Sequence, residues 1–138
     1  MLDERLKLVS FIVFCAAMVS AAGPVTRMGL TYELGFALNP VIGWIGSALF
    51  VFVVVNAANF MDGSDGILAA VMIPAGTALA LAGLAAGVMT SVITGVLLAA
   101  SLAGFVLLNW PPAKLFAGDV GALGAGALYA GGALALVN

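Results

Sequence analysis

Carboxylate and carboxamide side chains gather in two short segments of this chain. The first polar segment, residues 56–68 (NAANFMDGSDGIL), contains two aspartates and two asparagines. The second polar segment, residues 109–121 (NWPPAKLFAGDVG), contains one asparagine, one aspartate and Lys114, the only basic residue in the second half of the chain. Oxygen ligands of this kind, in a chain with no histidine, suit a hard ion such as Mg²⁺. A lysine beside them could neutralise a phosphate as a point charge, so the two segments predict a site for a phosphorylated substrate.

Spacing within the first polar segment favours convergence of its oxygens. Asn56 and Asn59 are three residues apart, so they share a face if a helix continues that far. Gly63 and Gly66 make continued helix beyond this point doubtful, and they favour a bent backbone that a ligand can approach closely. The composition of the segment fits ligand binding.

The elements around these segments must lie in a membrane. Hydrophobic residues make up 64% of the 138 residues and charged residues 7%, and the mean hydropathy is +1.27, values that exclude an ordinary soluble domain. The chain lacks the alternating pattern of a membrane barrel, so we expect an all-α, polytopic transmembrane helical bundle forming one membrane domain over residues 1–138. The net charge of −2 offers no basic patch for nucleic acid, and the lone Cys15 excludes an internal disulfide.

Hydropathy predicts about five membrane spans, at residues 6–22, 40–58, 67–86, 91–108 and 120–137. Residues 23–39 are less hydrophobic and are expected to form an interfacial loop. The first span could instead be a signal peptide, but Asp3 and Glu4 at its start favour a retained helix. Small residues spaced four apart in the last span favour close helix packing, and a homodimer is one partner hypothesis.

Five spans place the turns after the second and fourth spans on the same membrane face as the N-terminus. Arg5, Lys7 and Lys114 then share one side, and Arg27 lies on the other. The excess of basic residues on the shared side predicts that it is cytoplasmic. Both polar segments would therefore face the cytoplasm, where they can meet.

Each polar residue also has a purely structural interpretation. Asp65 and Asp119 precede apolar helices and could cap their N-termini. Asn109 could cap the C-terminus of the preceding helix, and Lys114 could act only as a topology signal. Capping does not account for the gathering of these residues at one membrane face, so we interpret them as a functional site.

The two segments resemble conserved signatures of the polyprenyl-phosphate N-acetylhexosamine-1-phosphate transferases. Residues 56–66 are similar to the pattern NxxNxxDGxDG, and residues 109–121 are similar to NxxPAKxFxGDxG. The resemblance implies transfer of a sugar 1-phosphate from a UDP-N-acetylhexosamine to undecaprenyl phosphate, with release of UMP. It also implies a requirement for Mg²⁺, with Mn²⁺ as an alternative, and location in the bacterial cytoplasmic membrane. The sequence NFMDG resembles the branch that initiates O-antigen and other polysaccharides more than the peptidoglycan branch.

The resemblance also implies roles for individual residues. Asp119 matches the aspartate that binds the metal ion, and Phe116 is placed to stack on uracil. The implied catalytic residues are Asp62, Asn59 and Lys114. The other implied substrate-binding residues are Asn56, Gly63, Ser64, Asp65 and Asn109.

The chain departs from the family pattern in three places. The adjacent aspartate pair of the family is missing, since Asp3-Glu4 falls several residues too late, and the histidine-rich loop is missing as well. Ala122 stands where many members have serine. We therefore expect the central part of a longer transferase, inactive as a separate polypeptide. Two alternatives are a non-catalytic membrane protein, either a degenerate paralogue or a helix-packing subunit, and a carrier, which would need Asp62 and Asp65 inside spans.

Overall fold

The computed structural model describes residues 4–29 and 35–138, with side chains from residue 9 onwards. Asp3 and Glu33 lie outside the described residues. The described residues form five helices: α1 (Glu4–Ala22), α2 (Pro40–Met61), α3 (Ile67–Ala86), α4 (Met89–Asn109) and α5 (Gly118–Val137). Two short strands, β1 (Arg27–Met28) and β2 (Phe36–Ala37), lie between α1 and α2. The expected all-α bundle of membrane helices is confirmed.

Within the described residues, helices α2 to α5 are long and apolar enough to cross a bilayer. Each has 20 to 22 residues, about 30 Å of helix at 1.5 Å per residue. The described apolar part of α1, Val9–Ala22, is shorter. Helices therefore form at the five expected positions, and over the described residues four of them reach the full length of a span.

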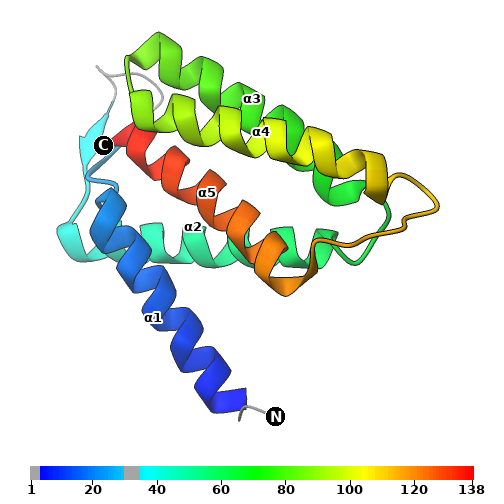
Figure 1. The fold of residues 1–138 in the computed structure, drawn as a ribbon. Helices are drawn as coiled ribbons and strands as arrows, with labels where there is room; N and C mark the ends of the chain where they lie inside the picture. Colours follow the sequence, from blue (N-terminus) through cyan, green and yellow to red (C-terminus); the bar gives the residue numbers. More distant parts are fainter. Residues whose placement is uncertain (1–3, 30–34) are drawn as a thin grey trace.

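Helices α3 and α4 lie side by side, and α5 packs against both of them and against α2 (Figure 1). Gly87, with φ of 72°, ends α3 in a left-handed turn that leads directly into α4. One cluster of buried residues, around Leu68, Leu98 and Ala122, joins α3, α4 and α5. Gly76 of α3 and Gly95 of α4 let these two helices approach closely, and van der Waals packing of this kind contributes to helix association in lipid.

Helix α1 diverges from the rest of the bundle towards its N-terminus (Figure 1). Cys15 and Val19 on its second half are buried against α2 and α5, whereas Val9 and Ile12 are exposed. The segment after α1 was expected to be only a loop. It forms an antiparallel pairing of β1 with β2, with Arg27 opposite Ala37.

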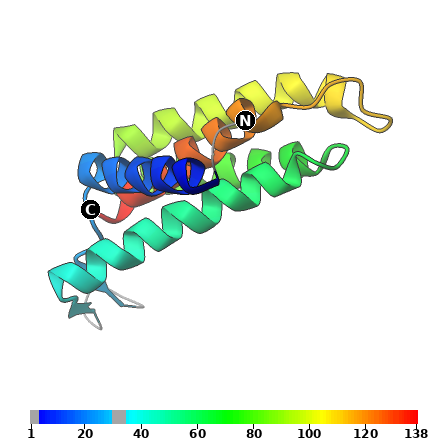
Figure 2. The ribbon, with the colours of Figure 1, turned by 90° about the horizontal axis from the view of Figure 1, so that it is seen from below.

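The α2–α3 and α4–α5 connections lie at one end of the bundle, and the strands and the C-terminus lie at the other (Figures 1 and 2). These two connections are the two polar segments. The expectation that the two polar segments can meet is therefore confirmed, whereas the membrane face on which they lie stays a prediction.

Close packing of α3 on α4 predicts different effects for two glycines of α4. A Cβ at Gly95 would lie 2.5 Å from the carbonyl oxygen of Gly76 and 2.7 Å from the nitrogen of Ala80, whereas a Cβ at Gly104 meets nothing within 4 Å. We expect Gly95→Ala to lower the free energy of unfolding by about 1–3 kcal/mol because backbone must shift. Gly104→Ala is the matched control, and thermal unfolding in detergent micelles measures both. Equal melting temperatures for the two variants would contradict this packing.

Candidate active site

The first polar segment begins within α2 and ends in a tight turn. Helix α2 continues to Met61, so Asn56 and Asn59 both lie in the helix, one turn apart. Asp62 is the C-cap residue of α2. Gly66 adopts a φ of 73°, which glycine reaches without strain, and α3 begins at the next residue.

The second polar segment crosses the same end of the bundle as an irregular loop. Helix α4 ends at Asn109, and Trp110 continues in an extended conformation that suits a residue before proline. Pro111 and Pro112 cannot donate backbone hydrogen bonds, so the loop depends on other groups to fix it. Helix α5 begins at Gly118 and carries Asp119 in its first turn.

Asp62 joins the two polar segments. One oxygen of its carboxylate accepts a hydrogen bond from the nitrogen of Ala117 at 2.9 Å, and the other accepts one from the nitrogen of Gly118 at 2.7 Å. Only 7% of Asp62 is exposed. The charge of this buried carboxylate is therefore balanced by backbone donors at the beginning of α5.

Asn109 makes a second connection between the segments. Its Oδ1 accepts a hydrogen bond from the nitrogen of Gly66 at 2.8 Å, and its Nδ2 donates to the carbonyl oxygen of Leu115 at 2.9 Å. The side chain is 1% exposed. A third connection comes from Asp65, whose Oδ2 accepts from the nitrogen of Ala113 at 3.0 Å.

These contacts revise the capping interpretation. The N-cap residue of α3 is Gly66 rather than Asp65, and the N-cap residue of α5 is Ala117 rather than Asp119. The C-cap residue of α4 is Trp110, one residue after Asn109. The three polar side chains therefore do not cap the helices that the sequence suggested.

Five residues from the two segments line one open cavity of about 340 Å³. They are Asn59, Asp62, Gly63, Phe116 and Asp119. Phe116 is 47% exposed. Asp119 is exposed, and its carboxylate makes no hydrogen bond or ion pair with the described part of the chain. A free carboxylate and an aromatic face thus border the same cavity.

The remaining predicted site residues lie outside this lining. Asn56 is exposed and its Nδ2 donates to the carbonyl oxygen of Phe52 in its own helix, at 2.8 Å. Ser64, Asp65 and Lys114 are exposed on the two loops. Asp65 and Asn109 do not line the cavity. Their hydrogen bonds, together with those of Asp62, hold the two segments together, and we call these hydrogen bonds the bracing contacts.

The donor set in the cavity fits a magnesium ion held partly by substrate. Mg²⁺ typically binds one or two protein carboxylates and completes its coordination with water and phosphate oxygens. Asp119 offers one such carboxylate, and the carboxamide of Asn59 offers a further oxygen in the same cavity. Among the described residues no three acidic, histidine or cysteine side chains converge as a ready-made metal cage.

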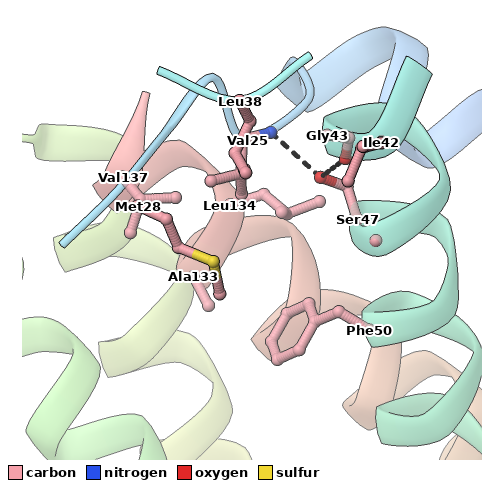
Figure 3. Close-up of a pocket in the computed structure, with 11 residues that line it drawn as sticks. Val25, Met28, Leu38, Ile42, Gly43, Ser47, Phe50, Ala133, Leu134 and Val137 are labelled. Carbon is pink, nitrogen blue, oxygen red and sulfur yellow. Dashed lines mark hydrogen bonds between the residues drawn. The ribbon is translucent and has the colours of Figure 1, made fainter. Parts of the chain in front are cut away.

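A second cavity, at the opposite end of the bundle, has a different character (Figure 3). It has a volume of about 420 Å³ and is lined by apolar side chains of α2, α5 and the segment before α2. Its hydroxyl, that of Ser47, donates to the carbonyl oxygen of Gly43 and accepts from the nitrogen of Val25. Among the described lining residues, the one side-chain hydroxyl therefore already makes two hydrogen bonds to backbone.

Sequence comparison places these features in a family. The chain matches the profile of Glycosyl transferase family 4 over residues 1–137. It therefore belongs to this family of membrane transferases, as the resemblance of the two polar segments suggested.

Individual relatives come from two branches of the family. The chain is 36% identical over 135 residues to the phospho-N-acetylmuramoyl-pentapeptide-transferase of Gloeothece citriformis, covering 92% of this chain and 33% of the relative. It is 32% identical over 92 residues to the probable undecaprenyl-phosphate N-acetylglucosaminyl 1-phosphate transferase of Bacillus subtilis, covering 67% of this chain and 24% of the relative. The matches thus span a quarter to a third of the length of these curated relatives.

The bracing contacts predict that Asn109 stabilises the fold. Asn109→Ala would leave the nitrogen of Gly66 and the carbonyl oxygen of Leu115 without their partner. We expect a loss of about 1–3 kcal/mol in the free energy of unfolding, because both hydrogen bonds are partly buried and would leave unpaired backbone groups. Denaturant titration followed by circular dichroism in micelles measures this loss.

Asn56→Ala is the matched control for that experiment. Asn56 is exposed and bonds only one turn back in its own helix, so its removal should change stability by less than about 0.5 kcal/mol. Equal losses for the two asparagine variants would show that the contacts of Asn109 between the segments add nothing to stability.

Proposed function

We propose that this chain forms the donor-binding part of a polyprenyl-phosphate N-acetylhexosamine-1-phosphate transferase. The observation that carries the proposal is the joint cavity, in which Asp119 and Phe116 of the second polar segment face Asn59 and Gly63 of the first. A nucleotide diphosphate needs an aromatic surface for its base and a metal-binding carboxylate for its phosphates. The cavity supplies both at one end of the membrane helices.

The proposed reaction is an exchange at phosphorus. A phosphate oxygen of undecaprenyl phosphate attacks the β-phosphorus of a UDP-N-acetylhexosamine. The bond between that phosphorus and the bridging oxygen breaks, and UMP leaves with the bridging oxygen. The reaction needs positioning and neutralisation of charge more than covalent help from the protein.

The residues at this end of the bundle have different proposed roles, according to the chemistry of their side chains. Asp119, with the carboxamide oxygen of Asn59, would hold Mg²⁺, which supplies charge stabilisation at the diphosphate when bound. Phe116 presents its exposed ring to the uracil base. Lys114 is exposed on the same loop and would attract the phosphates as a mobile positive charge.

Topology supports a cytoplasmic position for this site. The two polar segments share one end of the bundle, and Lys114 lies there. If Arg5 and Lys7 share this face, as five crossings predict, three basic residues lie opposite Arg27 alone, and such an excess is typical of the cytoplasmic side, where nucleotide sugars occur. We propose the bacterial inner membrane as the location and a cell-envelope polysaccharide or peptidoglycan precursor as the product, without a choice of sugar.

The stacking role of Phe116 predicts a selective loss of nucleotide affinity. We expect Phe116→Ala to weaken binding of UMP to the purified chain about tenfold, since stacking of a base on an aromatic ring contributes about 1–3 kcal/mol. Isothermal titration calorimetry measures the affinity. Trp110→Ala is the control, because Trp110 is an exposed aromatic residue of the same loop outside the cavity lining. A loss of UMP affinity in the Trp110 variant alone would contradict the assignment.

The metal role of Asp119 predicts a loss of catalysis. We expect Asp119→Asn to reduce Mg²⁺-dependent UMP release at least about a hundredfold, because the charge that holds the ion is removed. The assay uses membranes containing the polypeptide of the whole reading frame, UDP-N-acetylglucosamine and undecaprenyl phosphate. Turnover equal to wild type at low Mg²⁺ concentration would exclude Asp119 as a metal ligand.

A further inference from the structure

We infer that Asp62 is a positioning residue, which caps the N-terminus of α5 from another helix and thereby holds Phe116 and Asp119 in place. The inference rests on the proposed function for the roles of those two residues. It differs from the catalytic role that the family resemblance implies for Asp62. The hydrogen bonds of the Asp62 carboxylate carry it.

Helix α5 lacks a cap from its own sequence. Its first backbone N–H groups have no partner within the helix, and its N-cap residue, Ala117, has no side chain that could accept them. Asp62 lies 55 residues before Ala117 and 56 residues before Gly118. Its carboxylate accepts a hydrogen bond from the backbone nitrogen of each. Its negative charge also lies at the positive end of the α5 dipole, where it is stabilising.

The two amides that Asp62 holds lie between the two residues that the site needs. Phe116 immediately precedes Ala117, and Asp119 immediately follows Gly118. Gly118 has a φ of 68°, so the backbone turns sharply at this point. Fixing both amides therefore fixes the directions in which the ring of Phe116 and the carboxylate of Asp119 leave the backbone.

The three carboxylates of the polar segments thus have different uses. Asp62 is buried and accepts a short hydrogen bond on each oxygen, which makes it a poor candidate to exchange ligands with a metal ion. Asp65 accepts from Ala113, on the part of the loop away from the cavity. Asp119 is exposed, and its carboxylate has no partner among the described residues. Binding is therefore assigned to Asp119, and placement to Asp62.

Amide hydrogen exchange of the ligand-free chain tests the cap directly. In Asp62→Asn the side chain keeps its shape but one carboxylate acceptor becomes an NH₂ donor. We expect exchange at Ala117 and Gly118 to become about tenfold faster or more, because one amide loses its acceptor and the other keeps only an uncharged acceptor. Asp65→Asn is the matched control, and its effect should be confined to Ala113. Unchanged exchange at Ala117 and Gly118 in Asp62→Asn would overturn the inference.

Ligand binding tests whether the cap serves the site. We expect Asp62→Asn to weaken binding of UMP and of Mn²⁺, used as the metal probe, about tenfold each, because both Phe116 and Asp119 lose their position. In Asp119→Asn, which removes the ligand itself, the further change Asp62→Asn should have no additional effect on Mn²⁺ affinity. A further loss there would identify Asp62 as a ligand and overturn the positioning role.

A second variant tests the same inference if Asp62→Asn fails to fold. Gly118→Ala places a Cβ in open space but at a φ that disfavours alanine, so it strains the same turn while leaving Asp62 intact. We expect it to weaken UMP and Mn²⁺ binding in the same way, and unchanged binding would contradict the inference. If the wild-type chain bound neither probe, the proposed function would fail, whereas the exchange at Ala117 and Gly118 would still decide the cap.

Discussion

The carboxylate of Asp62 holds the beginning of α5 against the end of α2, and the geometry of the polar end of the bundle depends on this contact. A helix terminus near a membrane face has backbone groups that must find partners. Here one chain segment supplies acceptors for the amides of another. Asp62 binds Ala117 and Gly118, and Asn109 binds Gly66. The two polar segments are held together because backbone donors of each segment have their acceptor on a side chain of the other.

Apolar packing makes this bracing possible by setting the approach of α5 to α2. A Cβ at Gly126 of α5 would lie 2.8 Å from the Cα of Val55 in α2, so the absence of a side chain at Gly126 allows the two helices to come close. Asp62 lies about two turns beyond Val55, and Gly118 lies about two turns before Gly126. Close contact at the glycine therefore brings the end of one helix to the beginning of the other, within hydrogen-bond distance.

Most of the fold and part of the site follow from the sequence. Hydropathy predicts the helices because a span is a long, local signal, and the order of spans predicts that the polar segments meet. The pairing of β1 with β2 was missed because two-residue strands leave no such pattern. The sequence could not show which carboxylate is occupied, since the partners of Asp62 and Asn109 are backbone groups of Ala117, Gly118, Gly66 and Leu115. Every residue other than proline has the same backbone N–H, so the amino-acid sequence does not show which of these groups a side chain will bind.

The residues that brace the two segments are different from the residues that are open to a ligand, and this division explains how a polar site can be stable in an apolar chain. Burial of a polar group costs free energy unless the group is hydrogen-bonded. Asp62 and Asn109 are both buried, and both oxygens of Asp62 and both polar atoms of the Asn109 side chain make hydrogen bonds. Asp119 and Phe116 are exposed, and the Asp119 carboxylate makes no hydrogen bond or ion pair within the described part of the chain. The hydrogen bonds of Asp62 and Asn109 thus stabilise the loop and the helix start that carry Phe116 and Asp119, and so fix the positions of these two side chains. Such preorganisation is what a reaction driven by placement and charge requires.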